Sequence, residues 1–461
     1  MIRAWKSLTL NGERLHNIFL SGGIQMQAPV LSWWAALIGL AVAIILILRK
    51  LNPVYSLLLG AVVGALLGGA NLVQTIDILI KGSQSVMGTV LRVLAAGMLA
   101  GVMMESGAAD TLARAIVKTF GDRWALLALA VASMVITAVG VFIPVSVLIV
   151  APIALEVGKR MHFSKLSLLV ALSGGGKAGN IISPNPNTIA AAKGFNVELS
   201  QVMIADFIPA LFALAVAVLL AFLLRGKGSE VLDSDLENLA ADSQVDAQNL
   251  PSLGASLVTP LLAIFLLLLN PIGSIFHLEF LEKINLDAFY VLPFAAIVGA
   301  IAMKQWKKII PFAKSGMSRM TDVVLILIGA GAIGATITSS DLPAQIINLI
   351  KASGISGVFL APISGILMGA AAASTSTGVI LATGSFGKAI LGFGVTPIAA
   401  AAMVHTGAVV IDHLPHGNYF HVTANAMHMD ISERSHAILY ESLVGLTATV
   451  VATVMYGFLH L

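Results

Sequence analysis

Long apolar runs separated by short polar stretches cover the chain from residue 31 to its end. A helix needs roughly 20 apolar residues to cross a bilayer, and some of these runs reach that length while others fall short. The pattern predicts an all-α polytopic membrane protein with about 12 membrane elements, some shorter than a full crossing. The predicted spans are 31–48, 54–70, 88–104, 124–143, 145–157, 166–182, 203–224, 256–270, 288–303, 322–338, 356–372, 376–392, 396–412 and 437–459.

Two polar segments interrupt the pattern and suggest domain boundaries. Residues 1–30 lack a sustained apolar core and are predicted to be an N-terminal extension. Residues 226–254 contain six acidic residues and one lysine, without a periodic apolar face, which is typical of a solvated linker. The linker divides a first half, 31–225, from a second half, 255–461.

The two halves resemble each other. SGAADTLARAIVKTFG (106–121) matches SSDLPAQIINLIKASG (339–354), and TAVGVFIPVSVLIVAP (137–152) matches GAAAASTSTGVILATG (369–384). Farther on, LVALSGGGKAGNIISPNPNTIAAA pairs with AAMVHTGAVVIDHLPHGNYFHVTA. Three blocks that match in the same order indicate an internal duplication.

Each half also contains segments that cannot form straight membrane helices. SGGGKAGNIISPNPNTIAAAKG (173–194) lies between two apolar runs, and its counterpart is 405–421. Non-helical backbone at membrane depth is tolerated only where it lines a cavity, and paired interruptions in two repeats point to a transporter's binding site. The sequence therefore predicts two repeats with unwound helices, and a second pair of matched interruptions at the turn around Pro144 and at Ser374–Gly378.

The side chains at these breaks suggest the class of ligand. A helix that restarts after a break presents unpaired N–H groups and a positive dipole end, which favour an anion. The nearby side chains are mostly neutral donors and acceptors that suit a carboxylate and hydroxyl groups, which predicts a small hydroxylated organic anion. Close helix packing by small residues is the simpler alternative. The candidate substrate-binding residues are Asn180, Ser183, Asn185, Asn187, Thr188, Ser374, Thr375, Ser376, Thr377, Thr406, His413, His416 and Asn418.

Three ionisable residues in these segments are candidates for ion coupling. Charges inside a membrane are costly and often functional. Lys177 could attract the anion, or its ammonium could extend to the membrane interface. Asp412 and His405 could carry a coupling proton, since histidine titrates near neutral pH. A polar cap at a buried helix end is the alternative for Asp412.

Composition narrows the function further. The chain is 58% hydrophobic and 11% charged, has a formal net charge of +3 and contains no cysteine. Nothing in it predicts a nucleic-acid partner or a cofactor. The SGGGKAGN segment lacks the spacing of a phosphate-binding loop, so direct use of ATP is not expected. The irregular histidine spacing in HLPHGNYFH does not favour a metal site.

The segment HTGAVVIDHLPHGNYFHVTANAMHMDISER (405–434), followed by YESLVGL, resembles the gluconate permease family of bacterial secondary transporters. The resemblance implies the fold of the ion transporter superfamily and proton-coupled uptake of gluconate or a related hydroxy acid across the bacterial inner membrane. It also implies a homodimer in the lipid bilayer, built from two inverted repeats with re-entrant hairpins. By the same resemblance, Ser183–Thr188 and His413–Asn418 are the two unwound segments, and Pro144 and Ser374–Thr377 are the hairpin tips.

Three other functions remain open from the sequence. Asparagine side chains and unwound carbonyls also suit Na⁺, which would fit a sodium-coupled dicarboxylate carrier. A cation/proton antiporter would use the same buried ionisable groups. An integral-membrane enzyme that uses the histidine cluster is the alternative from outside the transporters.

Overall fold

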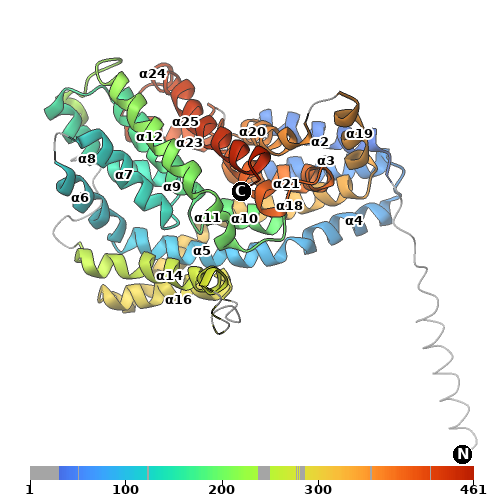
Figure 1. Cartoon of the computed structure of the whole chain (residues 1–461), viewed down its shortest axis with the longest axis horizontal. Coiled ribbons are helices and arrows are strands. Elements are labelled where there is room, and N and C mark those ends of the chain that lie inside the picture. The colour runs from blue at the N-terminus through green and yellow to red at the C-terminus, as the bar shows by residue number, and fades with distance from the viewer. Residues whose placement is uncertain are drawn as a thin grey trace, which may run out of the picture.

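The computed structural model describes residues 31–49, 51–121, 124–236, 250–276, 278, 280, 286–353, 356–415 and 417–460. The regular elements of this part are helices (Figure 1). The first half contains α2 (Trp33–Leu48), α3 (Pro53–Leu67), α4 (Leu72–Ser85), α5 (Met87–Glu105), α6 (Ala108–Phe120), α7 (Ala125–Ala138), α8 (Ile143–Met161), α9 (Lys165–Ile181), α10 (Pro186–Gly194), α11 (Leu199–Ala205) and α12 (Phe207–Leu224). The predicted N-terminal extension lies outside the described residues.

The second half repeats this order of elements. It contains α14 (Leu253–Phe276), α16 (Ala288–Ala302), α17 (Ile309–Arg319), α18 (Thr321–Thr338), α19 (Leu342–Ser353), α20 (Leu360–Ala372), α21 (Thr375–Gly392), α22 (Pro397–Ala408), α23 (Asn418–Ala426), α24 (Ile431–Ser435) and α25 (Ala437–Ala452), which continues as a π-helix over Thr453–Phe458. Helix α21 begins 375 − 143 = 232 residues after α8, and α23 begins 418 − 186 = 232 residues after α10.

Contacts between the halves follow the same correspondence. Helix α4 packs against α18, and its counterpart α17 packs against α5. Helix α10 packs against α21, while α23 packs against α8. Such an exchange is expected when two repeats are related by a two-fold axis. The predicted all-helical membrane fold, with two repeats, hairpins and broken helices, is confirmed.

Helix length explains the hairpins. Among the described residues, four helical segments are long and apolar enough to cross a membrane: Met87–Glu105, Phe207–Leu224, Thr321–Thr338 and Ile431–Phe458. Helix α7 has 14 residues, so it extends about 21 Å, less than the ~30 Å of a bilayer core. After a turn at 139–142 the chain begins α8, with Pro144 in its first turn, where a proline costs no hydrogen bond. Helices α20 and α21 form the equivalent hairpin.

Several helices were not among the predicted spans. Helices α4, α6, α17 and α19 are short amphipathic elements between them. Asn71 caps α4 by accepting from the Gln74 N–H at 2.9 Å, and the Gln74 side chain accepts from the Asn71 N–H. Figure 1 shows α4 and α5 as one long row across the molecule, beneath α10 and α18 and above α14 and α16.

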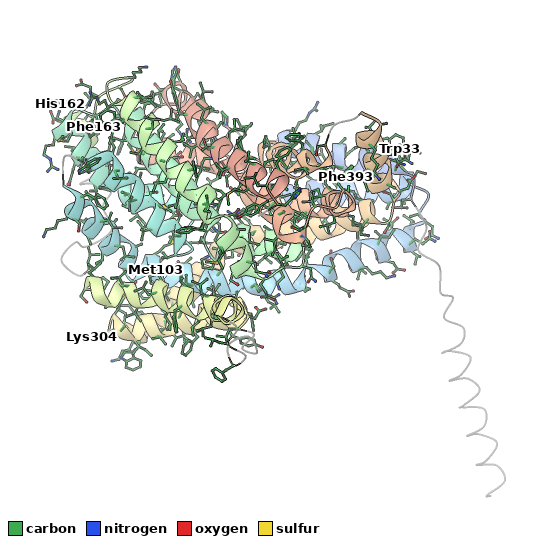
Figure 2. The ribbon with its side chains drawn as sticks, viewed as in Figure 1. Trp33, Met103, His162, Phe163, Lys304 and Phe393 are labelled. Carbon is green, nitrogen blue, oxygen red and sulfur yellow. The ribbon has the colours of Figure 1, made fainter. Side chains whose placement is uncertain are left out.

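The linker is less solvated than the sequence predicts. Val231 is buried, and Asp235 is buried in an ion pair with Lys165 at 2.9 Å. The Lys165 N–H also donates to the Ser229 carbonyl. Because Asp235 neutralises Lys165 at the start of α9, the first part of the linker is held against the first half. Figure 2 shows this end of the molecule, with His162 and Phe163, opposite Trp33 on the long axis.

Candidate substrate site

Glycines on either side of Lys177 bring α9 against α7. A Cβ at Gly175 would lie 2.0 Å from the Ala130 carbonyl oxygen, and one at Gly179 would lie 2.0 Å from that of Met134. These residues lie four apart, on one helical face, so only glycine permits this approach. The glycines thus bury the end of α9, and Lys177 with it.

The first break follows α9 and is organised by asparagines. Asn185 is the N-cap of α10, and its Oδ1 accepts from the N–H groups of Asn187 (2.8 Å) and Thr188 (3.1 Å). The Asn185 amide donates to the Asn180 carbonyl at 2.8 Å and to Asn180 Oδ1 at 2.7 Å. Two of the N–H groups expected to be bare are therefore capped by Asn185, which corrects that expectation. An anion here has to rely on side chains.

The second break, described from Val409 to Pro415, comes directly against Lys177. The Lys177 ammonium donates to the Val409 carbonyl, to Asp412 Oδ1 at 2.5 Å, and lies 3.1 Å from His413 Nδ1. Lys177 and Asp412 are each 1% exposed. The alternative in which Lys177 extends to the interface is wrong, because its charge is buried and neutralised by Asp412. The second unwound segment therefore lies against the C-terminal part of α9, just before the first break.

The second hairpin, α20–α21, also contacts Asp412 and the start of α10. Ser374 caps α21, and Thr375 donates to Asp412 Oδ2 at 2.5 Å. Ser376 donates to Asn187 Oδ1. The N-terminal end of α21 therefore contacts the second unwound segment through the Thr375 hydroxyl. It contacts the first turn of α10 through the Ser376 hydroxyl. In the first hairpin, the hydroxyls of Ser133 and Ser146 lie 2.9 Å apart.

A second layer of charge supports His413 from α23–α25. His413 Nε2 lies 3.1 Å from the Ile438 carbonyl and 3.6 Å from Glu441 Oε2. Arg434 donates both terminal nitrogens to Glu441, at 2.7 and 3.0 Å. Ser173 donates to Glu441 Oε1 at 2.5 Å. Buried charges require such pairing, since an unpaired one is strongly unfavourable.

His405 contacts a partner that the sequence analysis did not identify. Its Nδ1 lies 2.8 Å from Asp206 Oδ2, and both side chains are fully buried. His405 Nε2 and Asp206 Oδ1 have no hydrogen-bond partner among the described residues. Asp206 lies between α11 and α12, so this pair joins the end of the first repeat to α22.

Two buried donors at the first break also lack partners in the described part of the chain. They are Asn180 Nδ2 and Ser183 Oγ, on side chains that are at most 1% exposed. Leaving a buried polar atom unpaired typically costs about 1–3 kcal/mol. A ligand oxygen would remove that cost. These two atoms are therefore the clearest sign of an anion or hydroxyl position.

The remaining predicted substrate-binding residues differ in how close they lie to Lys177 and Asp412. Thr188 and Thr377 are buried and lie near their helix caps. The Thr406 hydroxyl is satisfied within α22, by Ala402 and Met403. Asn418 is exposed at the start of α23. His416 lies outside the described residues.

Sequence reasoning missed several residues that form ion pairs or hydrogen bonds around Lys177, His413 and His405. They are Ser173, Asp206, Tyr419, Arg434 and Glu441. Glu441 lies within the last predicted span, 437–459, and Arg434 lies three residues before it. A search for every charged residue in or near an apolar run would therefore have found both. Ser173 and Tyr419, whose hydroxyl oxygens lie 2.6 Å apart, give no comparable signal.

Unwound helices that meet a hairpin tip around buried charges define a polytopic membrane transport protein. The chain belongs to the GntP family of permeases, because the family model described as GntP family permease matches residues 31–459. The resemblance to gluconate permeases noted from the sequence is thereby confirmed.

Several relatives carry transporter names. The chain is 47% identical over 422 residues to an "Uncharacterized transporter" of Haemophilus influenzae, covering 92% of this chain and 97% of the relative. It is 22% identical to the "High-affinity gluconate transporter" of Escherichia coli, with 83% and 89% covered. It is 24% identical to the "D-serine transporter DsdX" of Escherichia coli, with 75% and 80% covered.

A solved structure has the same fold. The crystal structure of the Alcanivorax borkumensis YdaH transporter, which has an unusual topology, aligns with a TM-score of 0.64 and 16% identity. The alignment covers 84% of this chain and 90% of that one.

Proposed function

We propose that this protein is a proton-coupled symporter that carries a small hydroxylated carboxylate across the bacterial inner membrane by alternating access. The observation that carries the proposal is the buried pair between Lys177, on α9 just before the first break, and Asp412 of the second break, together with the unpartnered donors Asn180 and Ser183 at the first break. A homodimer, as the family resemblance implies, is the assembly we expect.

The substrate class is supported by the site and by the named relatives. Gluconate and D-serine, for which two relatives are named, both carry a carboxylate and a hydroxyl group. In this site the buried Lys177 ammonium can attract the carboxylate. Asn180 Nδ2 and Ser183 Oγ can donate to its oxygens or to a hydroxyl.

The charge balance of the site supports coupling to one proton. With His413 neutral, the charges of Lys177, Arg434, Asp412 and Glu441 cancel. A carboxylate that entered alone would leave a buried negative charge uncompensated, which is strongly unfavourable. A proton taken up with it restores neutrality. His413 is placed to receive that proton, because its Nδ1 can either accept from Lys177 or donate to Asp412, 3.0 Å away.

The same geometry argues against sodium at this point. Asp412 Oδ1 is engaged by Lys177 and His413, and Oδ2 by Thr375. A sodium ion would have to displace the ammonium from the carboxylate. The sodium-coupled carrier and the cation/proton antiporter are therefore the alternatives that the experiments below distinguish from proton symport.

The first experiment identifies the substrate. Purified protein is screened by thermal shift against gluconate, other sugar acids, hydroxy acids, dicarboxylates and D-serine, with and without sodium. A ligand that binds only the folded state raises its stability by mass action. A hydroxylated carboxylate should do so without sodium. Stabilisation only by sodium, or by no member of this set, would contradict the proposal.

The second experiment tests coupling in proteoliposomes with the best ligand. A pH gradient without sodium should drive its accumulation. Asp412→Asn should spare exchange and abolish accumulation, whereas Asp235→Asn, the same change at a buried pair outside the site, should spare both. Accumulation that survives in Asp412→Asn would remove Asp412 from the coupling mechanism.

A further inference from the structure

A cavity of about 700 Å³ lies beside the candidate site, between α4, α5, α10, α18 and α21. Four basic side chains line it, and among the described residues no acidic side chain does. The basic residues are Lys81 and Lys388, which are exposed, and Arg92 and Lys193, which are half-buried. Because Lys81 on α4 and Lys388 on α21 are exposed, we infer that the cavity opens to solvent on the side formed by these two helices.

Two of these four charges, on Lys81 and Lys388, are uncompensated within the described part of the chain. Arg92 forms a bidentate pair with Asp287, with Nε 2.9 Å from Oδ1, and also donates to the Gly88 carbonyl at 2.7 Å. Lys81 and Lys388 have no ion-pair or hydrogen-bond partner there, whereas the charge of Lys193 also interacts with Asp287. The cavity therefore has a net positive potential, and a hollow with low-dielectric walls strengthens such a field.

Two helices connect this cavity to the candidate site. Helix α21 carries Ser376 at its N-terminal end and lines the cavity from Ile380 to Leu391. Ile380 lies four residues after Ser376, a rise of about 6 Å along the helix. Helix α10 behaves similarly, with Asn187 at the site and Ala190 already in the cavity wall. The cavity thus begins about one helical turn from the site.

We propose that this cavity is an access chamber with its own binding subsite for the carboxylate group of a small organic anion. Lys388 and Lys193 hold the anion before it moves along α10 and α21 to Asn187 and Ser376. The role in transport rests on the proposed function, but the anion preference of the chamber does not. The chamber concentrates anions electrostatically and excludes cations, which lowers the substrate concentration needed at the central site.

The test uses the absence of cysteine in the chain. A single cysteine is introduced as Thr383→Cys in the chamber wall, and Ser85→Cys provides a second chamber reporter. The measured quantity is the ratio of labelling rates for two methanethiosulfonates of similar size, an anionic sulfonate and a cationic trimethylammonium. Thr119→Cys, exposed on α6 at another part of the surface, is the reference reporter.

We expect the chamber reporters to favour the anionic reagent relative to Thr119→Cys. Adding Lys388→Gln or Lys193→Gln should lower the chamber ratio about threefold at low ionic strength, and less at high salt. Lys227→Gln, which removes an exposed lysine outside the cavity, should leave it unchanged. An equal ratio at all three reporters, or a ratio indifferent to Lys388 and Lys193, would overturn the chamber.

Uptake of the best ligand separates the two proposals. In the transporter, Lys388→Gln should raise KM at least threefold in low salt and leave the maximal rate unchanged. Anion-selective labelling without transport of any tested anion would preserve the chamber and contradict the proposed function. Transport of a tested anion together with labelling that does not favour the anionic reagent would preserve the proposed function and contradict the chamber.

Discussion

Replacing Lys177 by methionine tests whether α9 meets the second unwound segment at Asp412 as described. The substitution keeps the length of the side chain but removes the ammonium that lies 2.5 Å from Asp412 Oδ1. Asp412 is 1% exposed and would retain only Thr375 at 2.5 Å and His413 at 3.0 Å. Removing one partner of a buried ion pair typically costs about 3–5 kcal/mol.

A double-mutant cycle isolates this effect. In Lys177→Met/Asp412→Asn no buried charge is left unpaired, so we expect the double variant to regain about 2 kcal/mol relative to Lys177→Met. Unfolding in detergent can be followed by the fluorescence of the five tryptophans. Lys165→Met, which breaks the buried pair with Asp235, should also destabilise the fold, but should leave transport unchanged.

Additive losses in the double variant would contradict an interaction between Lys177 and Asp412. If the losses of Lys177→Met and Asp412→Asn simply add in the double variant, the two charges do not interact, and the meeting of α9 with the second unwound segment would be refuted. If Lys165→Met abolished transport as fully as Lys177→Met, the loss would reflect general instability rather than the site.

Three further predictions concern packing, binding and coupling. Gly175→Val should abolish folded protein in detergent extracts, since a Cβ there would lie 2.0 Å from the Ala130 carbonyl oxygen, whereas Gly226→Val, with open space around it, should fold normally. Ser376→Ala should raise KM for the best ligand by about tenfold, the effect of one lost hydrogen bond, and an unchanged KM would remove Ser376 from the site. His405→Gln should reduce proton-driven accumulation while sparing exchange, and equal losses of both would assign the pair with Asp206 a structural role.

The sequence predicts the membrane elements well because their apolar runs are continuous. It also identifies the two breaks, since glycine, proline and asparagine cannot continue a membrane helix without a compensating environment. Asp412 and Lys177 stand out individually as charges in apolar surroundings. That they neutralise each other depends on the distance between two segments 235 residues apart, which no local pattern contains.

Other features of the site depend on tertiary packing alone. Asn185 could serve as a ligand for substrate or as a helix cap, and its sequence context does not distinguish these uses; the structure shows the cap. His405 lies in the same segment as Asp412 but contacts Asp206 of the first repeat. The basic chamber is assembled from lysines on α4, α10 and α21, which no single segment reveals.

The most direct test of the account is substrate-driven proton movement. Proteoliposomes without sodium, and with equal pH on both sides, enclose a pH-sensitive dye, and the best ligand from the thermal-shift screen is added outside. The account predicts acidification of the interior with the wild-type protein and with Asp235→Asn, and none with Asp412→Asn. Ligand uptake without acidification, or acidification that requires sodium, would contradict the claim that a proton enters with the anion.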